Sequence, residues 1–300
     1  MPTKPWSSIL VAVRDPGARK QIAVRKAARI AAATGAELTL FHAFSTPFAL
    51  PTPMPADADA ILRAIAKQRR TQLLDVARPL RAEGLKVQCE AVWDFPPAHA
   101  IVRRVAQSKP DLVVAESHRH SRLARWFLAN SDWELIRECP CPVWFVKQER
   151  LAKQPLVLTA IDPTHARSKP TALDDRLLQA AKAVSQYLGG SIAMIHVEDE
   201  SQLVRGGQIE SIERLAKRNR VATAPRVLRA GAPADALVAA AAELKADLLV
   251  MGAVSRSGLS HFHIGNTAEA VIDAVTCDVL VVKPRQFKSA VARKRPKLPT

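Results

Sequence analysis

The stretch that decides the fold is a short apolar run followed by a loop of small residues. The run is Asp247-Leu-Leu-Val-Met251, and the loop reads Gly252-Ala-Val-Ser255-Arg256-Ser257-Gly258-Leu-Ser-His261-Phe-His263-Ile-Gly265-Asn266. Helical periodicity follows from Thr267 to Ala274, so the pattern is strand, glycine loop, helix. Unpaired N–H groups and a positive dipole at a helix start favour an anion such as phosphate. The alternative is that the glycines only turn the chain.

Apolar runs and amphipathic stretches alternate on both sides of this loop. Because parallel strands need crossover connections and helices supply them, the alternation predicts an α/β fold with doubly wound parallel sheets. Pro79 is expected to kink or end the long second helix. The predicted strands are 8–13, 36–44, 87–93, 111–115, 143–147, 156–161, 191–197, 226–230, 247–251 and 279–283, and the predicted helices are 21–34, 57–83, 97–108, 173–188, 209–220, 234–244 and 267–274.

The chain contains two copies of one unit, which become visible when it is shifted on itself by about 136 positions. Asp111 then falls on Asp247, Asn130 on Asn266, and the segment Cys141–Lys147 on Cys277–Lys283. Earlier in the copies the shift is 148, so the second copy is about twelve residues shorter, mostly in the proline-rich loop and the long helix. The predicted organisation is a first domain at 1–147, a linker at 148–155, a second domain at 156–285 and a basic, disordered tail at 286–300.

Composition bounds the classes of function. The chain has 300 residues, 48% of them hydrophobic, and a net charge of +16, so weak contact with polyanions is expected, mainly through the tail. No run reaches the ~20 apolar residues of a membrane span, and the first residues lack a signal-peptide plan, so the cytoplasm is the expected compartment. The four cysteines predict buried thiols rather than a disulfide framework.

The tandem plan and the segment from Asp132 to Lys147, with Cys139-Pro-Cys141-Pro-Val143-Trp144, resemble the universal stress protein family and its tandem two-domain, UspE-type branch. The resemblance covers about Ser7 to Phe287. It implies two adenine-nucleotide alpha hydrolase-like domains, a regulatory role in a stress response, and binding of ATP or a related adenine nucleotide, with or without Mg²⁺. No general base for hydrolysis is evident, so a binding protein is expected before an enzyme, with slow ATP hydrolysis at most.

The resemblance also implies where the nucleotide would bind. Family members that bind nucleotides carry a Gly, a second Gly three positions on, and a Gly followed by Ser or Thr; here Gly252 and Gly265 keep the pattern, whereas Ser255 and Asn266 depart from it. In the first copy a carboxylate, Glu116, replaces the first glycine, so no triphosphate is expected there. The candidate nucleotide-binding residues are Asp162, Val197, Gly252, Ser255, Arg256, Gly258, Gly265, Asn266 and Thr267.

Two other patterns were weighed. No metal site is expected; the candidates for one are two pairs of histidines at i and i+2, which are His261, His263, His118 and His120. The two closely spaced cysteines in Cys139-Pro-Cys141 are similar to a redox pair. The proline and the short spacing predict instead that the thiols point apart and contribute to core packing.

Two functions therefore remain open. One is a nucleotide-binding stress protein. The other is an interaction module that has lost nucleotide and uses an apolar ligand in the first domain, or the basic surface and tail on nucleic acid or membrane. The two domains are expected to pack face to face through the terminal strands 143–147 and 279–283, as an internal pseudo-dimer, which predicts a monomer.

Overall fold

The computed structural model describes residues 6–45, 58–94, 96–117, 131–150, 152–163, 172–198, 208–253, 266–285, 287 and 289–291. The described residues fall into two compact units. The N-unit holds the chain from Trp6 to Cys141, residues 118–120 apart, together with the segment that begins at Lys288. The C-unit extends from Pro142 to Phe287.

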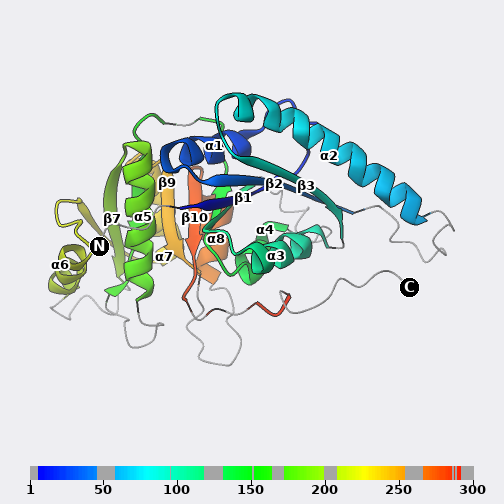
Figure 1. Cartoon of the computed structure of the whole chain (residues 1–300). Helices are drawn as coiled ribbons and strands as arrows, with labels where there is room; N and C mark the ends of the chain where they lie inside the picture. The colour runs from blue at the N-terminus through cyan, green and yellow to red at the C-terminus, as the bar shows by residue number, and fades with distance from the viewer. Residues whose placement is uncertain are drawn as a thin grey trace. The chain divides into compact units, whose positions relative to one another are not determined.

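The N-unit is a parallel sheet with helices on both faces. Its strands lie in the order β3-β2-β1-β4, with β1 central at Ser8–Ala12 and its neighbour β2 at Glu37–Phe44. In the view of Figure 1, α1 and α2 lie above this sheet, and α3 and α4 lie below it. The remaining elements are β3 (Val87–Trp93), β4 (Leu112–Glu116), α1 (Ile22–Thr34), α2 (Ala58–Ala82), α3 (Pro97–Ser108) and α4 (Ser131–Glu138).

The C-unit repeats this plan and adds one strand. Its parallel strands lie in the order β10-β9-β6-β7-β8, and β5, at Val143–Val146, joins β10 antiparallel. Helix α5 packs on β6 and β9, while α7 and α8 pack on one another. The remaining elements are β6 (Leu156–Ala160), β7 (Ser191–Glu198), β8 (Arg226–Ala230), β9 (Leu248–Gly252), β10 (Asp278–Val282), α5 (Leu173–Leu188), α6 (Gln208–Arg218), α7 (Pro233–Glu243) and α8 (Asn266–Ala274).

The sequence predicted most of these elements closely, whereas α4 was not among the predicted helices. Gly35 and Gly189 end α1 and α5 in the left-handed conformation, as a glycine stop requires. The shortening of the second copy falls where expected, because α2 has 25 residues and α6 has 11. Helix α2 continues through Pro79 and ends at Ala82, since a proline in the last turn removes only one of the helical hydrogen bonds.

The two terminal strands meet, but the expectation that they pack face to face was wrong: β10 and β5 pair edge to edge, antiparallel, within one sheet. Asp278 secures the join: its buried carboxylate accepts hydrogen bonds from Trp144 Nε1 at 2.9 Å and from the backbone N–H groups of Lys147 and Gln148 at 2.9 and 3.1 Å. The Lys147 ammonium group donates to the last carbonyls of α8, at Ile272 and at Val275 (2.8 Å). Strand β5 therefore completes the C-unit, although its sequence belongs to the first copy.

The beginning of the basic C-terminal segment is bound to the N-unit. Glu138 Oε2, at the end of α4, accepts hydrogen bonds from Ser289 Oγ at 2.7 Å and from the N–H groups of Ala290 and Val291 at 3.0 and 3.4 Å. Val291 is buried. The predicted disordered part of this tail falls mainly on residues 292–300, outside the described residues.

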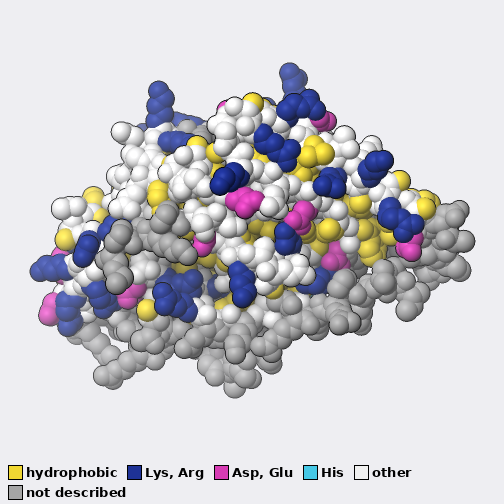
Figure 2. All heavy atoms as spheres, viewed as in Figure 1, with side chains coloured by type: hydrophobic (Ala, Val, Ile, Leu, Met, Phe, Trp, Pro, Cys, Tyr) yellow, Lys and Arg dark blue, Asp and Glu magenta, His cyan; other side chains and the backbone are white. Residues whose placement is uncertain are grey.

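Figure 2 shows Lys and Arg side chains spread over the face in view, with Asp and Glu side chains among them. In the part of the chain that the structure describes, no helix is both long and apolar enough to cross a membrane.

Candidate functional site

The candidate site lies at the carboxyl edge of the C-unit sheet. From β6 the chain moves outward to β7 and β8, then returns to the other side of β6 to form β9 and β10. The reversal creates a topological switch point between β6 and β9, which are paired in parallel with Thr159 opposite Val250. Ligands of open α/β sheets bind outside the carboxyl ends of strands at such points.

Three of the predicted nucleotide-binding residues come together at this edge. Asp162 follows β6, Val197 is the next-to-last residue of β7, and Gly252 ends β9. All three residues are partly exposed. The backbone N–H of Asp162 donates to Asp174 Oδ1 at 3.2 Å, which ties the end of β6 to the first turn of α5. Helix α8 begins at Asn266, one residue before the predicted start at Thr267.

Gly252 is required by close packing at this position. A Cβ atom there would lie 3.0 Å from Cδ2 of Leu173, the first residue of α5. A larger residue would require the buried Leu173 side chain to shift by a few tenths of an ångström.

In each unit a buried histidine forms a hydrogen bond with the backbone carbonyl group directly after the central strand, β1 or β6. His196 Nδ1 lies 3.1 Å from the carbonyl oxygen of Ile161, and His42 Nδ1 lies 2.8 Å from that of Val13. Burial lowers the pKa of His42, which keeps the ring neutral, so Nδ1 donates and Nε2 is left as an acceptor. The sequence analysis did not identify this pair. The internal repeat carried the signal, because His42 and His196 lie 154 positions apart and the helix-ending glycines Gly35 and Gly189 have the same separation.

Two cations also approach the carboxyl edge of the C-unit. Arg176, in the first turns of α5, donates to the carbonyl oxygen of Lys283, directly after β10. The Lys283 ammonium group lies 3.6 Å from the centre of the Phe287 ring, an arrangement in which the ring quadrupole attracts the cation. The predicted set of site residues contained neither side chain.

The same edge of the N-unit carries a carboxylate of its own. Glu116, which ends β4 and corresponds to Gly252, directs Oε1 to the backbone N–H groups of Ile22 and Ala23 at 3.0 and 3.3 Å. These are the first residues of α1, whose N-cap, Gln21, makes no side-chain cap hydrogen bond and whose first turn has no acidic residue. The glutamate thus supplies the negative charge that the start of this helix favours.

Comparisons with known proteins agree with this architecture. The model of the universal stress protein family matches residues 5–147 and again residues 152–283. The chain belongs to the universal stress protein family.

Relatives of similar length match nearly the whole chain. Universal stress protein E of Salmonella typhi is 27% identical over 95% of this chain and 97% of its own length, and that of Escherichia coli K12 is 26% identical over 95% and 96%. Among solved structures, a putative universal stress protein from Pseudomonas aeruginosa covers 94% of this chain and 95% of its own, with a TM-score of 0.73 and 23% identity. A universal stress protein from Archaeoglobus fulgidus has a TM-score of 0.69, with 19% identity over 92% of this chain and 96% of its own.

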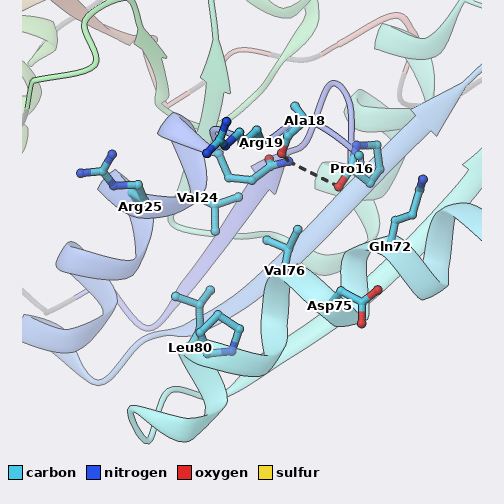
Figure 3. A pocket seen from close by; sticks show the side chains of 12 residues that line it. Pro16, Ala18, Arg19, Val24, Arg25, Gln72, Asp75, Val76 and Leu80 are labelled. Atoms are coloured by element: carbon cyan, nitrogen blue, oxygen red, sulfur yellow. Dashed lines mark hydrogen bonds between the residues drawn. The ribbon is translucent and has the colours of Figure 1, made fainter.

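A separate cavity of about 450 Å³ lies in the N-unit of this universal stress protein, between α1 and α2. Figure 3 shows Val24, Val76 and Leu80 along its wall, with Arg19 and Arg25 beside them. Gln21 Nε2 holds the loop at its mouth by donating to the carbonyl oxygens of Asp15 and Ala18, at 2.9 and 3.0 Å. The remaining lining residues are Pro16, Gly17, Gln72, Asp75 and Pro79.

The equivalent helices of the C-unit are tied together instead. Asp175, which occupies the position of Gln21 in the repeat, accepts hydrogen bonds from Arg218 Nε and Nη2 at 2.9 and 2.8 Å and from Asn219 Nδ2 at 2.6 Å. This contact joins the start of α5 to the end of α6.

Several predicted residues lie outside the described part of the chain. They are Ser255, Arg256, Gly258, Gly265, His118, His120, His261 and His263. Asn266 and Thr267 are described as the start of α8. Among the described residues there is no group of three or more His, Cys, Asp or Glu side chains that could hold a metal ion.

The prediction that Cys139 and Cys141 point apart was wrong. Their sulfur atoms lie 3.7 Å from one another. The reason is that Cys139 ends α4 before the chain turns at Pro140, so the two residues do not lie on one extended segment.

Proposed function

We propose that this chain is a regulatory protein of the stress response whose C-unit binds ATP or a related adenine nucleotide, with Mg²⁺, whereas its N-unit does not. The site would lie at the carboxyl edge of β6 and β9. Asp162 and Val197 would face the nucleoside and the segment from Gly252 to Thr267 would face the phosphates.

The observation that carries the proposal is the difference between Glu116 and Gly252. At the N-unit edge, a carboxylate already occupies the N–H groups at the start of α1. A phosphate at this edge would meet the like charge of the Glu116 carboxylate. At the C-unit edge, the corresponding position has no side chain, and Arg176 and Lys283 bring positive charge to the same end of the sheet.

Calorimetry with ATP and Mg²⁺ tests this proposal on three full-length proteins: the wild type, Gly252→Glu and Gly252→Gln. Both variants push against Leu173 to the same extent, so their difference isolates the charge. We expect the wild type to bind, and the glutamate variant to bind at least about tenfold more weakly than the glutamine variant, since tenfold corresponds to about 1.4 kcal/mol. Equal affinities of the two variants, or no binding by the wild type, would refute the proposal.

The cavity of the N-unit favours a second, independent function. It is open to solvent, its volume falls within the range of small-molecule sites, and its apolar wall with two arginines and one carboxylate, Asp75, fits a ligand that has an apolar body and one anionic group. This ligand class corresponds to the apolar-ligand alternative that the sequence leaves open for the first domain.

The anionic aromatic dye anilinonaphthalene sulfonate is a direct probe of the cavity. Val76→Trp fills the cavity, whereas Leu74→Trp adds the same ring to an exposed position of α2 that does not line it. We expect Val76→Trp to weaken dye binding at least about tenfold and Leu74→Trp to leave it unchanged. If the two variants bind the dye equally, the cavity is not a ligand site.

A further inference from the structure

The pair Cys139 and Cys141 combines closeness with unequal exposure. The sulfur atoms are 3.7 Å apart, which is van der Waals contact, and a disulfide bond would bring them to about 2.05 Å. Cys139 is fully buried, while the side chain of Cys141 is partly exposed. An oxidant from solution therefore meets Cys141 first, with Cys139 directly behind it.

The internal repeat shows that packing does not require a sulfur atom at position 139. Cys141 corresponds to Cys277 in the C-unit, and Cys139 corresponds to Val275. Both positions close the last turn of a helix in the same way: the N–H of Cys139 donates to Leu135 at 2.9 Å, and that of Val275 donates to Val271 at 2.8 Å. A valine thus fills the same place, and the second thiol is a property of the N-unit alone.

We propose that Cys139 and Cys141 are a redox-active dithiol, which a low-molecular-weight disulfide such as oxidised glutathione converts reversibly to an intramolecular disulfide. This modification site is independent of nucleotide binding. It gives a stress protein a direct response to the thiol–disulfide balance of its surroundings.

The reaction consists of two exchange steps. The Cys141 thiolate attacks one sulfur of oxidised glutathione, the S–S bond of glutathione breaks, and one glutathione thiolate leaves with a proton from solvent. Cys139 then gives up its proton and attacks the Cys141 sulfur of the mixed disulfide. The second glutathione leaves, and the Cys139–Cys141 bond remains. Two protein thiols are oxidised and one glutathione disulfide is reduced to two thiols.

The other two cysteines serve as internal controls. Burial, with a smaller contribution from Asp278, raises the pKa of Cys277 to about 12, and burial also raises the pKa of Cys89. Because the thiolate is the attacking species, neither residue should react in the folded protein.

The test uses the folded, full-length protein in buffers of reduced and oxidised glutathione, followed by acid quenching, alkylation and intact-mass analysis. The matched variant is Cys139→Val, which copies the C-unit. We expect the wild type to lose two alkylatable thiols without retaining glutathione, and reduced glutathione to restore them. Cys139→Val should retain one glutathione on Cys141, released at least about tenfold more slowly than from the wild type, because the neighbouring thiol is missing.

Two further readouts separate this role from a structural one. Cys141→Val should acquire no glutathione, since Cys139 is buried, and thermal melts should show both variants folded. A stable glutathione adduct on wild-type Cys141 would overturn the proposal. So would a wild type that keeps all four thiols under conditions in which Cys139→Val becomes modified.

Discussion

The two units place opposite chemistry at the same end of the same kind of sheet. In the N-unit, Glu116 ends β4 and caps the start of α1 with its carboxylate. In the C-unit, Gly252 ends β9, and the start of α5 packs against it through Leu173. The start of α1 thus receives its negative charge from the end of β4, whereas the start of α5 carries its own acidic residues, Asp174 and Asp175, and the end of β9 has no side chain. The comparison shows that corresponding strand ends of the two copies carry different side chains, and the proposed difference in nucleotide binding rests on this position.

A second contrast concerns the strand that the two copies share. Strand β5 originates from the first copy and completes the sheet of the second, where Asp278 receives three donors from it and from the residues after it. The first copy has Pro142 at the position of Asp278. Because a proline side chain cannot accept hydrogen bonds, Pro142 cannot form the bonds that Asp278 forms with Trp144, Lys147 and Gln148.

The largest effect on this comparison is expected from Asp278→Ala, which leaves three donors without their acceptor. Because Trp144 and Asp278 are buried and the Lys147 and Gln148 donors are partly buried, the free energy of unfolding of the C-unit should fall by about 3 kcal/mol. Trp144→Phe removes only one donor and should cost about 1 kcal/mol. Urea denaturation of both variants checks the ratio, and equal losses would show that Asp278 does not hold β5.

A smaller effect is expected from Glu116→Ala, which removes the cap of α1. The loss should be about 1 to 2 kcal/mol, and amide exchange of Ile22 and Ala23 should accelerate. Glu83→Ala, at an exposed position of the same unit, is the control and should change stability by less than about 0.5 kcal/mol. If the two alanine variants have the same denaturation midpoint, the Glu116 carboxylate does not cap the helix.

The smallest effect is a change in pH dependence at His42. Burial lowers its pKa in the folded state, Arg69 acts in the same direction, and the bond to Val13 and the charge of Asp15 oppose the shift. The folded protein therefore binds fewer protons than the unfolded chain, so stability should fall as the pH drops below about 6.5. Between about pH 7.5 and about pH 5.5, His42→Phe should lose less stability than the wild type. An identical pH profile of the two proteins would contradict this assignment.

The sequence predicted the fold because apolar periodicity and glycine stops are local signals. The stop at Gly35 and the start of α5 at Leu173 follow from such patterns. The repeat also predicted that the strands 143–147 and 279–283 would meet. These features can be predicted without knowing which way individual side chains point.

The contacts of individual side chains could not be predicted in the same way. A carboxylate at position 116 was recognised as unfavourable for phosphate, but its bond to α1 depends on a helix that lies 94 residues earlier in the chain. The approach of Cys139 to Cys141 depends on where α4 ends, and element ends are the least certain part of a sequence-based prediction. The role of Asp278 required the knowledge that β5 joins the sheet of the other copy.

The central claim is that an adenine nucleotide binds to the C-unit and not to the N-unit. Its most direct test is photolabelling of the full-length protein with an azido derivative of ATP in the presence of Mg²⁺, followed by mapping of the labelled peptides by mass spectrometry. The account predicts label within residues 156–285 that unlabelled ATP displaces and that Gly252→Glu reduces. Label of equal strength in peptides from residues 1–147, or label that ATP does not displace, would contradict it.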